Sequence, residues 1–273
     1  MDDHTLGLPL AVTNTMLRLI GSDLDIALAL NEFKQSYHQD FANVQPVARR
    51  YLSAPPGSEN ARLLALALSK ALRNWGACRR RSPTLLPVSQ IESALKEKQL
   101  HKRLLKLSEQ SLSAFSLDQQ ENRLLKSTSA FNDAGAFDRE ILGVLNTLAD
   151  ALFLKNTSVT YPMKALLLIT GLMPALDSQV RGGLTRAGKA GFIQQQLLPR
   201  NAQQAAGRRI CELPFYLGDC WNSNLEVFVK GILDSKYQGL LDTPGRVFDI
   251  LLFMQNRPNR NRILVFDQGR EWR

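Results

Sequence analysis

Histidine and cysteine are scarce in this sequence, and their positions are far apart. The chain has three of each: His4, His38, His101, Cys78, Cys211 and Cys220. None of them forms a Cys-x-x-Cys or His-x-x-x-His pair. Because structural zinc sites draw their ligands from closely spaced pairs, we expect no metal site. Three isolated histidines also give no basis for a Ser-His-Asp arrangement. The odd, scattered cysteines are typical of reduced thiols in an intracellular protein.

A long apolar run is missing as well. The longest one, Ala165–Leu176, is interrupted by Thr170, Gly171 and Pro174. It is shorter than the roughly 20 residues that a membrane-spanning helix needs. The acidic first residues lack the basic and then apolar pattern of a signal peptide. We therefore expect a cytoplasmic protein with no membrane contact, and we expect no cofactor.

Positive charge is concentrated in one part of the chain. The net charge is +9, and the segment Lys70–Lys106 holds ten lysine and arginine residues against two glutamates, a net charge of +8. Such a local positive field attracts polyanions, of which nucleic acid is the commonest inside cells. The alternative is a solvated helix face with no partner. We favour the polyanion.

The hydrophobic pattern predicts a mostly α, multi-helical globular protein with at most a short C-terminal strand or hairpin at Ile263–Phe266. A first helical segment begins near Leu24 and is expected to end at Pro46. Further helices are expected at Glu59–Trp75, Ser89–Leu107, Phe137–Leu154, Met163–Thr170, Ala202–Leu213, Asn224–Leu233 and Pro244–Gln255.

Two polar stretches interrupt this pattern. Pro83 and Pro87 exclude a helix over 79–87, which predicts a basic loop, and Ser89 with Glu92 then forms a capping-box pattern for one basic helix. The segment 108–135 is rich in serine, glutamine and asparagine, as linkers are. We place a boundary near Asp133, which divides the chain into an N-terminal helical region, 1–132, and a C-terminal helical region, 133–273.

A glycine-rich basic turn follows the apolar helix near residue 170. Gly183–Ala190 matches the phosphate-binding pattern G-x-x-x-x-G-K, but Ala190 stands where a hydroxyl residue would bind magnesium. We therefore do not expect nucleotide hydrolysis. Arg181, Arg186 and Lys189 could hold a phosphate group, or they could complement the C-terminal ends of helices.

One carboxylate, Asp177, enters this turn directly from the apolar segment. The run Pro174-Ala-Leu-Asp177-Ser-Gln-Val-Arg181 after an apolar helix that ends in glycine is similar to part of the helix-hairpin-helix DNA glycosylases. The resemblance covers about Met163–Leu184. It implies that Asp177 stabilises the positive charge that develops as a damaged base leaves, or orients the attacking water.

The same segment departs from that family in two respects. Asn156–Pro162 replaces the expected glycine hairpin, and the lysine of the lyase enzymes has no counterpart in register, since Lys164 lies too near the acid. The alternative for Asp177 is a helix cap that accepts backbone N–H bonds. A third motif, Glu212–Trp221, is rich in aromatic residues; we interpret it as a corner of the core rather than a base-stacking surface.

Three functions are compatible with these features. We favour nucleic-acid binding, to DNA or RNA, through phosphate contacts, in a protein that could belong to a larger complex. The second is a glycosylase-like enzyme with Asp177 as the catalytic acid, and the third is an interaction subunit without nucleic acid. The expected phosphate-contacting residues are Arg73, Arg79, Arg80, Arg81, Lys96, Lys98, Lys102, Arg103, Lys106, Arg181, Arg186 and Lys189.

Overall fold

The computed structural model describes residues 16–189, 191–192 and 197–267. Eleven α-helices make up most of this part of the chain, so the mostly α class is confirmed. Their bounds are α1 Asp23–Glu32, α2 Gln35–Leu52, α3 Asn60–Asn74, α4 Val88–Leu95, α5 Lys98–Ser108, α6 Ala134–Leu152, α7 Thr160–Thr170, α8 Ser178–Arg186, α9 Ala205–Ser223, α10 Leu225–Leu233 and α11 Pro244–Gln255.

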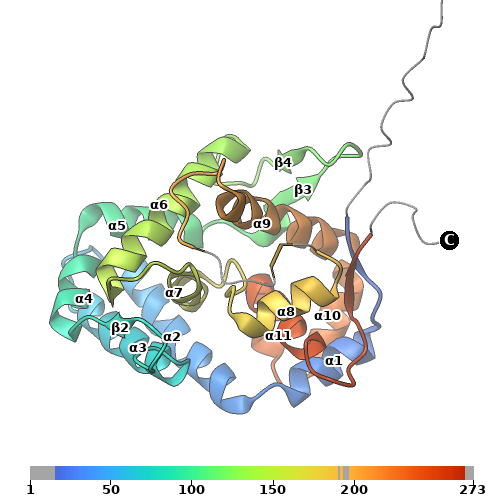
Figure 1. The fold of residues 1–273 in the computed structure, drawn as a ribbon, viewed down its shortest axis with the longest axis horizontal. Helices are drawn as coiled ribbons and strands as arrows, with labels where there is room; N and C mark the ends of the chain where they lie inside the picture. The colour runs from blue at the N-terminus through green and yellow to red at the C-terminus, as the bar shows by residue number, and fades with distance from the viewer. Residues whose placement is uncertain (1–15, 190, 193–196, 268–273) are drawn as a thin grey trace, which may run out of the picture.

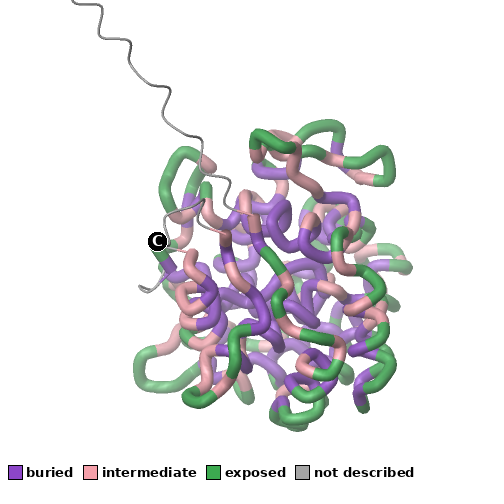
Figure 2. Tube along the Cα trace, turned by 90° about the vertical axis from the view of Figure 1, so that its right-hand side faces the viewer, coloured by how far each residue is buried: buried purple, intermediate pink, exposed green. Residues whose placement is uncertain are grey.

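Helix α7 lies in the middle of the molecule, with α2, α3, α5 and α6 packed around it (Figure 1). Its residues from Thr160 to Ile169 are all buried, including the charged Lys164. A helix that is apolar around its whole circumference is stable only inside a core. Helices α1, α8, α10 and α11 form a second group, in which α1 packs on α10 and α11, and α8 packs on α11 (Figure 1). Buried segments run through the interior of the molecule (Figure 2).

The strands are short and form three two-stranded antiparallel sheets. The expected C-terminal strand is present as β6, Leu264–Phe266, and pairs with β1, Leu17–Leu19, so that Leu17 lies opposite Phe266. The other pairs are β2, Thr84–Leu85, with β5, Phe153–Leu154, and β3, Phe115–Leu117, with β4, Arg123–Leu125. Two short 3₁₀ helices complete the described elements, η1 at Leu112–Ala114 and η2 at Gln238–Asp242.

Two expected helix ends were wrong. Pro46 lies inside α2 and Pro214 lies inside α9, so both helices continue beyond the ends expected for them. Proline normally breaks a helix, because it removes one backbone hydrogen bond and crowds the preceding turn. The buried residues that follow each proline, such as Ala48 in α2 and Phe215 in α9, favour continuation through packing.

The basic helix expected at Ser89–Leu107 is two helices. Lys96 ends α4, and the extended backbone of Glu97 begins α5. Ser89 lies within α4, whose N-cap is Pro87, so the capping box is not formed. The break lets α4 pack on α3 while α5 packs on α6.

The polar segment 108–135 is ordered structure rather than a linker. Its hairpin, β3 and β4, packs on α9, and the ring of Phe115 contacts both Phe137 and Phe215 edge to face. Asp219 of α9 accepts a hydrogen bond from the backbone N–H of Leu117 at 3.3 Å. Buried side chains from both sides of Asp133 form one continuous cluster. The division into two regions there stays a prediction.

Candidate functional site at Asp177

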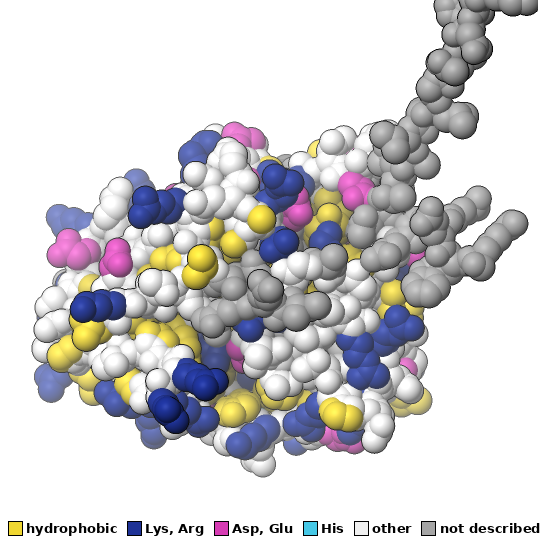
Figure 3. All heavy atoms as spheres, in the orientation of Figure 1, with side chains coloured by type: hydrophobic (Ala, Val, Ile, Leu, Met, Phe, Trp, Pro, Cys, Tyr) yellow, Lys and Arg dark blue, Asp and Glu magenta, His cyan; other side chains and the backbone are white. Residues whose placement is uncertain are grey.

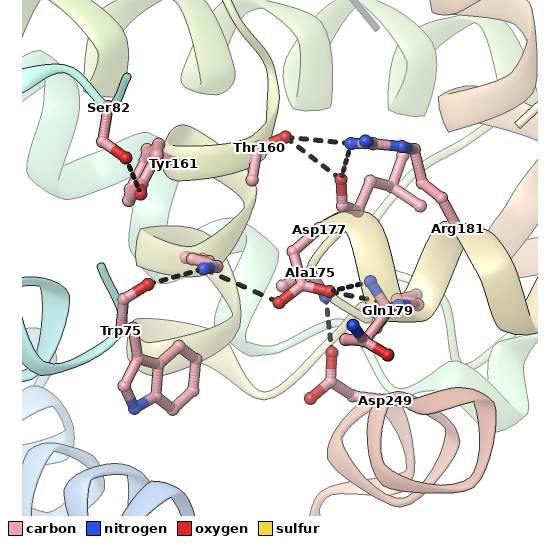
Figure 4. Close-up of polar contacts among 12 residues, drawn as sticks. Trp75, Ser82, Thr160, Tyr161, Ala175, Asp177, Gln179, Arg181 and Asp249 are labelled. Carbon is pink, nitrogen blue, oxygen red and sulfur yellow. Dashed lines mark hydrogen bonds and ion pairs between the residues drawn. The ribbon is translucent and has the colours of Figure 1, made fainter. Parts of the chain in front are cut away.

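The turn that carries Asp177 is held from two sides. Helix α7 ends at Gly171 in the left-handed conformation, with φ 68°, which glycine adopts without strain. Asp249 of α11 then accepts a hydrogen bond from the N–H of Ala175 at 2.9 Å, and the Thr160 hydroxyl donates to the carbonyl of Leu176 at 3.1 Å. Figure 4 shows Asp177 between these two attachments. Its position is therefore set by α7 and α11 together.

Asp177 is the N-cap of α8, as one of the two interpretations of this residue predicts. Its Oδ1 accepts hydrogen bonds from the N–H groups of Gln179 at 3.0 Å and Val180 at 3.1 Å. Its Oδ2 lies 3.6 Å from the Nζ of Lys164. Only part of the carboxylate's capacity is used by the cap, so capping and a functional role are compatible.

Lys164 is the one charged residue on the buried α7. Its Nζ donates to the carbonyl of Trp75 at 2.8 Å, which ties α7 to the end of α3 (Figure 4). Burial lowers the pKa of Lys164, while the neighbouring carboxylates of Asp177 and Asp249 oppose that shift. A buried ammonium beside a carboxylate gives this site a local charge pair inside an apolar core.

A cavity of about 360 Å³ opens beside Asp177. Its wall combines aromatic rings with charged groups, and the lining residues are Phe33, Tyr37, Trp75, Arg79, Lys164, Ala175, Asp177, Ser178, Gln179, Arg246, Asp249 and Phe253. Figure 3 shows the surface hollowed between the end of α3 and α8, with basic and acidic side chains in the hollow. The volume suits a ligand as large as one nucleobase or a small sugar.

Arg246 and Asp249 form a buried ion pair at the floor of this cavity. The guanidinium of Arg246 also lies over the rings of Phe33, Phe41 and Trp75 at 5.0 to 5.2 Å, and it donates to the carbonyl of Tyr37. Burial raises the pKa of Asp249 to about 6, although Arg246 opposes the shift. The pair fixes Asp249 in the position from which it holds the Asp177 turn.

Some basic side chains of the segment Lys70–Lys106 contact other residues of the protein, and others are exposed. Arg103 pairs with Glu140, Lys96 pairs with Glu92, and Lys106 lies over the ring of Phe131. The other residues proposed from this segment are exposed: Arg73 at the end of α3, Arg79, Arg80 and Arg81 in the following loop, and Lys98 and Lys102 on α5. Arg79 also lines the Asp177 cavity.

The three basic residues of the glycine-rich turn contact the protein itself. Arg181 is buried and donates to Thr160 and to the carbonyl of Leu176 (Figure 4). Arg186 donates to the carbonyls of residues 255, 257 and 260. Lys189 lies over the rings of Tyr216 and Phe266 at 4.0 and 5.1 Å. All three side chains contact the fold, but only Arg186 contacts the C-terminal end of a helix, α11.

The P-loop-like pattern also has a structural explanation. Residues 178–186 are helix α8 rather than a loop after a strand. A Cβ on Gly183 would lie 2.0 Å from the carbonyl oxygen of Leu252, and one on Gly182 would lie 2.2 Å from Asn256. These glycines therefore allow α8 to pack closely on α11. The aromatic motif Glu212–Trp221 is likewise part of α9, with Phe215, Leu217 and Trp221 buried.

The sequence did not single out four residues of the cavity: Trp75, Lys164, Arg246 and Asp249. Lys164 had a signal, since it is the only charge in an otherwise apolar helix. Arg246 and Asp249 had a similar one, because they are three residues apart in an apolar helix. Trp75 had none, because its contacts with Lys164 and Arg246 join segments that are remote in the chain.

Within residues 16–189, 191–192 and 197–267, no group of three or more histidine, cysteine, aspartate or glutamate side chains is arranged to hold a metal ion. No helix in the same residues has both the length and the apolar character to span a bilayer. Comparisons with protein-family models, with curated protein sequences and with solved structures find no match to this chain.

Proposed function

We propose that this protein binds nucleic acid through backbone phosphates, with the loop Arg79–Arg81 as its main contact. All three arginines are exposed, and none of them forms an ion pair with another described residue. Guanidinium groups bind phosphate oxygens with two parallel hydrogen bonds, which suits this loop to a polyanion. The observation that carries the proposal is that Arg79 belongs both to this loop and to the Asp177 cavity.

The loop is held in one conformation by its own hydrogen bonds. The N–H of Cys78 donates to the carbonyl of Pro83 at 3.0 Å, and the N–H of Ser82 donates to the carbonyl of Arg79 at 2.9 Å. The hydroxyl of Tyr161, on α7, donates to that of Ser82 at 2.7 Å. Because the backbone is already ordered, phosphate binding costs less conformational entropy than it would on a free loop.

Salt dependence tests the proposal. We expect the affinity for a short DNA or RNA to fall steeply as salt concentration rises, because phosphate contacts release counterions. The variant Arg79→Gln, Arg80→Gln, Arg81→Gln should bind more weakly and with a flatter salt dependence. A control with the same charge change elsewhere, Arg62→Gln, Arg139→Gln, Lys155→Gln, should keep most of the affinity. Equal losses in the two variants would contradict the loop as the contact.

A second candidate, an enzyme that cleaves the bond between a base and its sugar, is favoured by the position of Asp177. Its carboxylate lies in the wall of a cavity with aromatic side chains, and an extruded base fits a site of this kind. In such a reaction the C–N bond breaks with its electron pair on the base, water adds to the sugar carbon, and the proton that this water releases goes to the base. Asp177 would stabilise the positive charge on the sugar, or orient that water.

Turnover separates the two candidates. Duplexes with single altered bases should yield abasic sites with the wild-type protein and none with Asp177→Asn, while both proteins bind the same DNA equally. Turnover by Asp177→Asn at the wild-type rate would exclude Asp177 from the chemistry. Binding without turnover on any substrate would leave phosphate-mediated binding as the function. Membership of a larger complex and a cytoplasmic location stay expectations from the sequence.

A further inference from the structure

A second cavity lies along α2. It has a volume of about 500 Å³ and is formed by α2 together with the residues that connect α10 to α11. The lining residues are His38, Phe41, Ala42, Gln45, Pro46, Arg49, Lys236, Tyr237, Gln238, Gly239, Leu240 and Thr243. The rings of His38 and Tyr237 are stacked there, with centroids 3.7 Å apart.

The charges around this cavity are of one sign. Arg49 and Lys236 are exposed side chains of its wall, although the Nζ of Lys236 also donates to the carbonyl of Asn31 at 2.6 Å. The described lining residues include no aspartate or glutamate. Among nearby acids, Asp40 of α2 is bonded to Asn74 and Trp75 instead, and Asp234 and Asp242 are not lining residues. Burial first, and then the charges of Arg246 and Lys236, lower the pKa of His38 to about 4. The wall therefore favours an anion.

The stacked pair has unused hydrogen-bonding capacity. The Nδ1 of His38 and the hydroxyl of Tyr237 are both covered, and neither has a hydrogen-bond partner among the described residues. A buried polar group without a partner costs about 1 to 3 kcal/mol. A ligand with oxygen atoms that displaced the stack slightly would supply partners for both groups.

We propose that this second cavity binds a phosphate group, with Arg49 and Lys236 as its charged contacts and the His38–Tyr237 pair as its floor. A cavity of this size exceeds a single phosphate, so an organic part of the ligand lies against Phe41, Pro46 and Leu240. Small phosphate esters and the backbone of a nucleic acid both present this chemistry. The site does not depend on Asp177 or on any chemistry in the first cavity.

The imidazole of His38 is a direct reporter for the test. In NMR titrations of the full chain, inorganic phosphate at pH 7.5 should shift the His38 ring signals and leave those of the buried His101 in place. Sulfate, whose charge stays constant over the pH range used, should raise the pKa of His38, because a bound anion favours the protonated ring. Arg49→Gln and Lys236→Gln should each weaken anion binding roughly threefold, as expected for exposed charges.

Arg50→Gln is the matched control, since Arg50 neighbours Arg49 on α2 and is exposed but is not a lining residue. It should leave the affinity unchanged, and Asp177→Asn should do the same. Adenosine monophosphate and a short DNA without terminal phosphates then identify the source of the phosphate group. Tighter binding of adenosine monophosphate at His38 indicates a small phosphate ester. Tighter binding of the DNA indicates the nucleic-acid backbone. The proposal is overturned if none of these anions moves the His38 signals, or if Arg50→Gln weakens binding as much as Arg49→Gln.

Discussion

The ammonium of Lys164 lies 3.6 Å from Oδ2 of Asp177 and at the same time donates to the carbonyl of Trp75. One buried side chain from the interior of α7 thereby connects the C-terminal end of α3 to the N-terminal end of α8. Because a buried charge must be compensated, this connection limits how α3 and α8 can sit around the cavity.

Asparagine should replace Asp177 as the cap of α8, but it should not replace its carboxylate in catalysis. Asp177→Asn keeps a side-chain oxygen for the N–H groups of Gln179 and Val180, whereas Asp177→Ala should cost about 1 kcal/mol of unfolding free energy. Asp133, the N-cap of α6, bonds to the N–H of Ala136 and serves as the reference helix cap. Urea denaturation should show a loss for Asp177→Ala at least as large as for Asp133→Ala, because Asp177 also compensates the buried ammonium of Lys164. A smaller loss at Asp177 than at Asp133 would contradict its role as the cap of α8.

Lys164 and Asp177 should be energetically coupled. Lys164→Met leaves the Trp75 carbonyl without its donor, and we expect a loss of about 1 to 3 kcal/mol of stability. In a double-mutant cycle with Asp177→Asn, a coupling of at least about 0.5 kcal/mol should appear. Denaturation of the wild type, the two single variants and the double variant measures this coupling. Additive losses of stability would show that the charges of Lys164 and Asp177 act independently.

The Arg246–Asp249 pair should tolerate joint replacement better than loss of one partner. Arg246→Met or Asp249→Asn alone leaves an uncompensated buried group, for which a cost of about 3 to 5 kcal/mol is expected. The double variant Arg246→Met, Asp249→Asn should lose less than the sum of the two single variants. Thermal denaturation checks this, and a double variant as unstable as that sum would contradict the pairing.

Gly183 should not accept a side chain. The added Cβ of Gly183→Ala would lie 2.0 Å from the carbonyl oxygen of Leu252, and α8 would have to move away from α11. We expect a loss of about 1 to 3 kcal/mol, in the range of overpacked cores. Gly57→Ala is the control, because no atom lies within 4 Å of its added Cβ. Similar stabilities for the two variants would disprove the close packing of α8 on α11.

His38 should make stability depend on pH. Its pKa is lowered to about 4 in the folded protein from an ordinary value of 6.5, so the unfolded chain binds the proton more readily between these values. Stability therefore rises as the pH increases from about 4 to 6.5. In His38→Gln this contribution is absent, so the difference in unfolding free energy between wild type and variant should grow over that range. Urea denaturation at pH 4.5 and pH 7 measures it, and a constant difference would contradict the lowered pKa.

Periodicity predicted most of the helices because burial of one face is a local pattern in the sequence. The ranges Asn224–Leu233 and Pro244–Gln255 differ from α10 and α11 by at most one residue. The errors lie where a local rule competes with packing. Pro46 was expected to end the first helical segment, and the helix from Ala202 was expected to end at Leu213. The core on both sides of Pro46 and Pro214 keeps α2 and α9 continuous.

The site was predicted only in part. Asp177 was identified because a single acid after an apolar run is visible in the sequence, and its capping role followed from helix chemistry. Asp249 and Arg246 are about 70 residues away along the chain, and no spacing rule connects such distant groups. Arg103 was expected to contact phosphate, but Glu140 on α6 pairs with it, a contact that depends on how α5 packs.

The sequence by itself determined the helical class, the buried character of α7 and the carboxylate at the start of α8, because hydrophobic spacing and capping act over a few residues. The tertiary structure decided which charges remain exposed, which are paired, and that Trp75, Lys164, Asp177 and Asp249 meet at one cavity. Those relationships depend on distances between segments remote in the chain. Only the packing of the helices sets such distances.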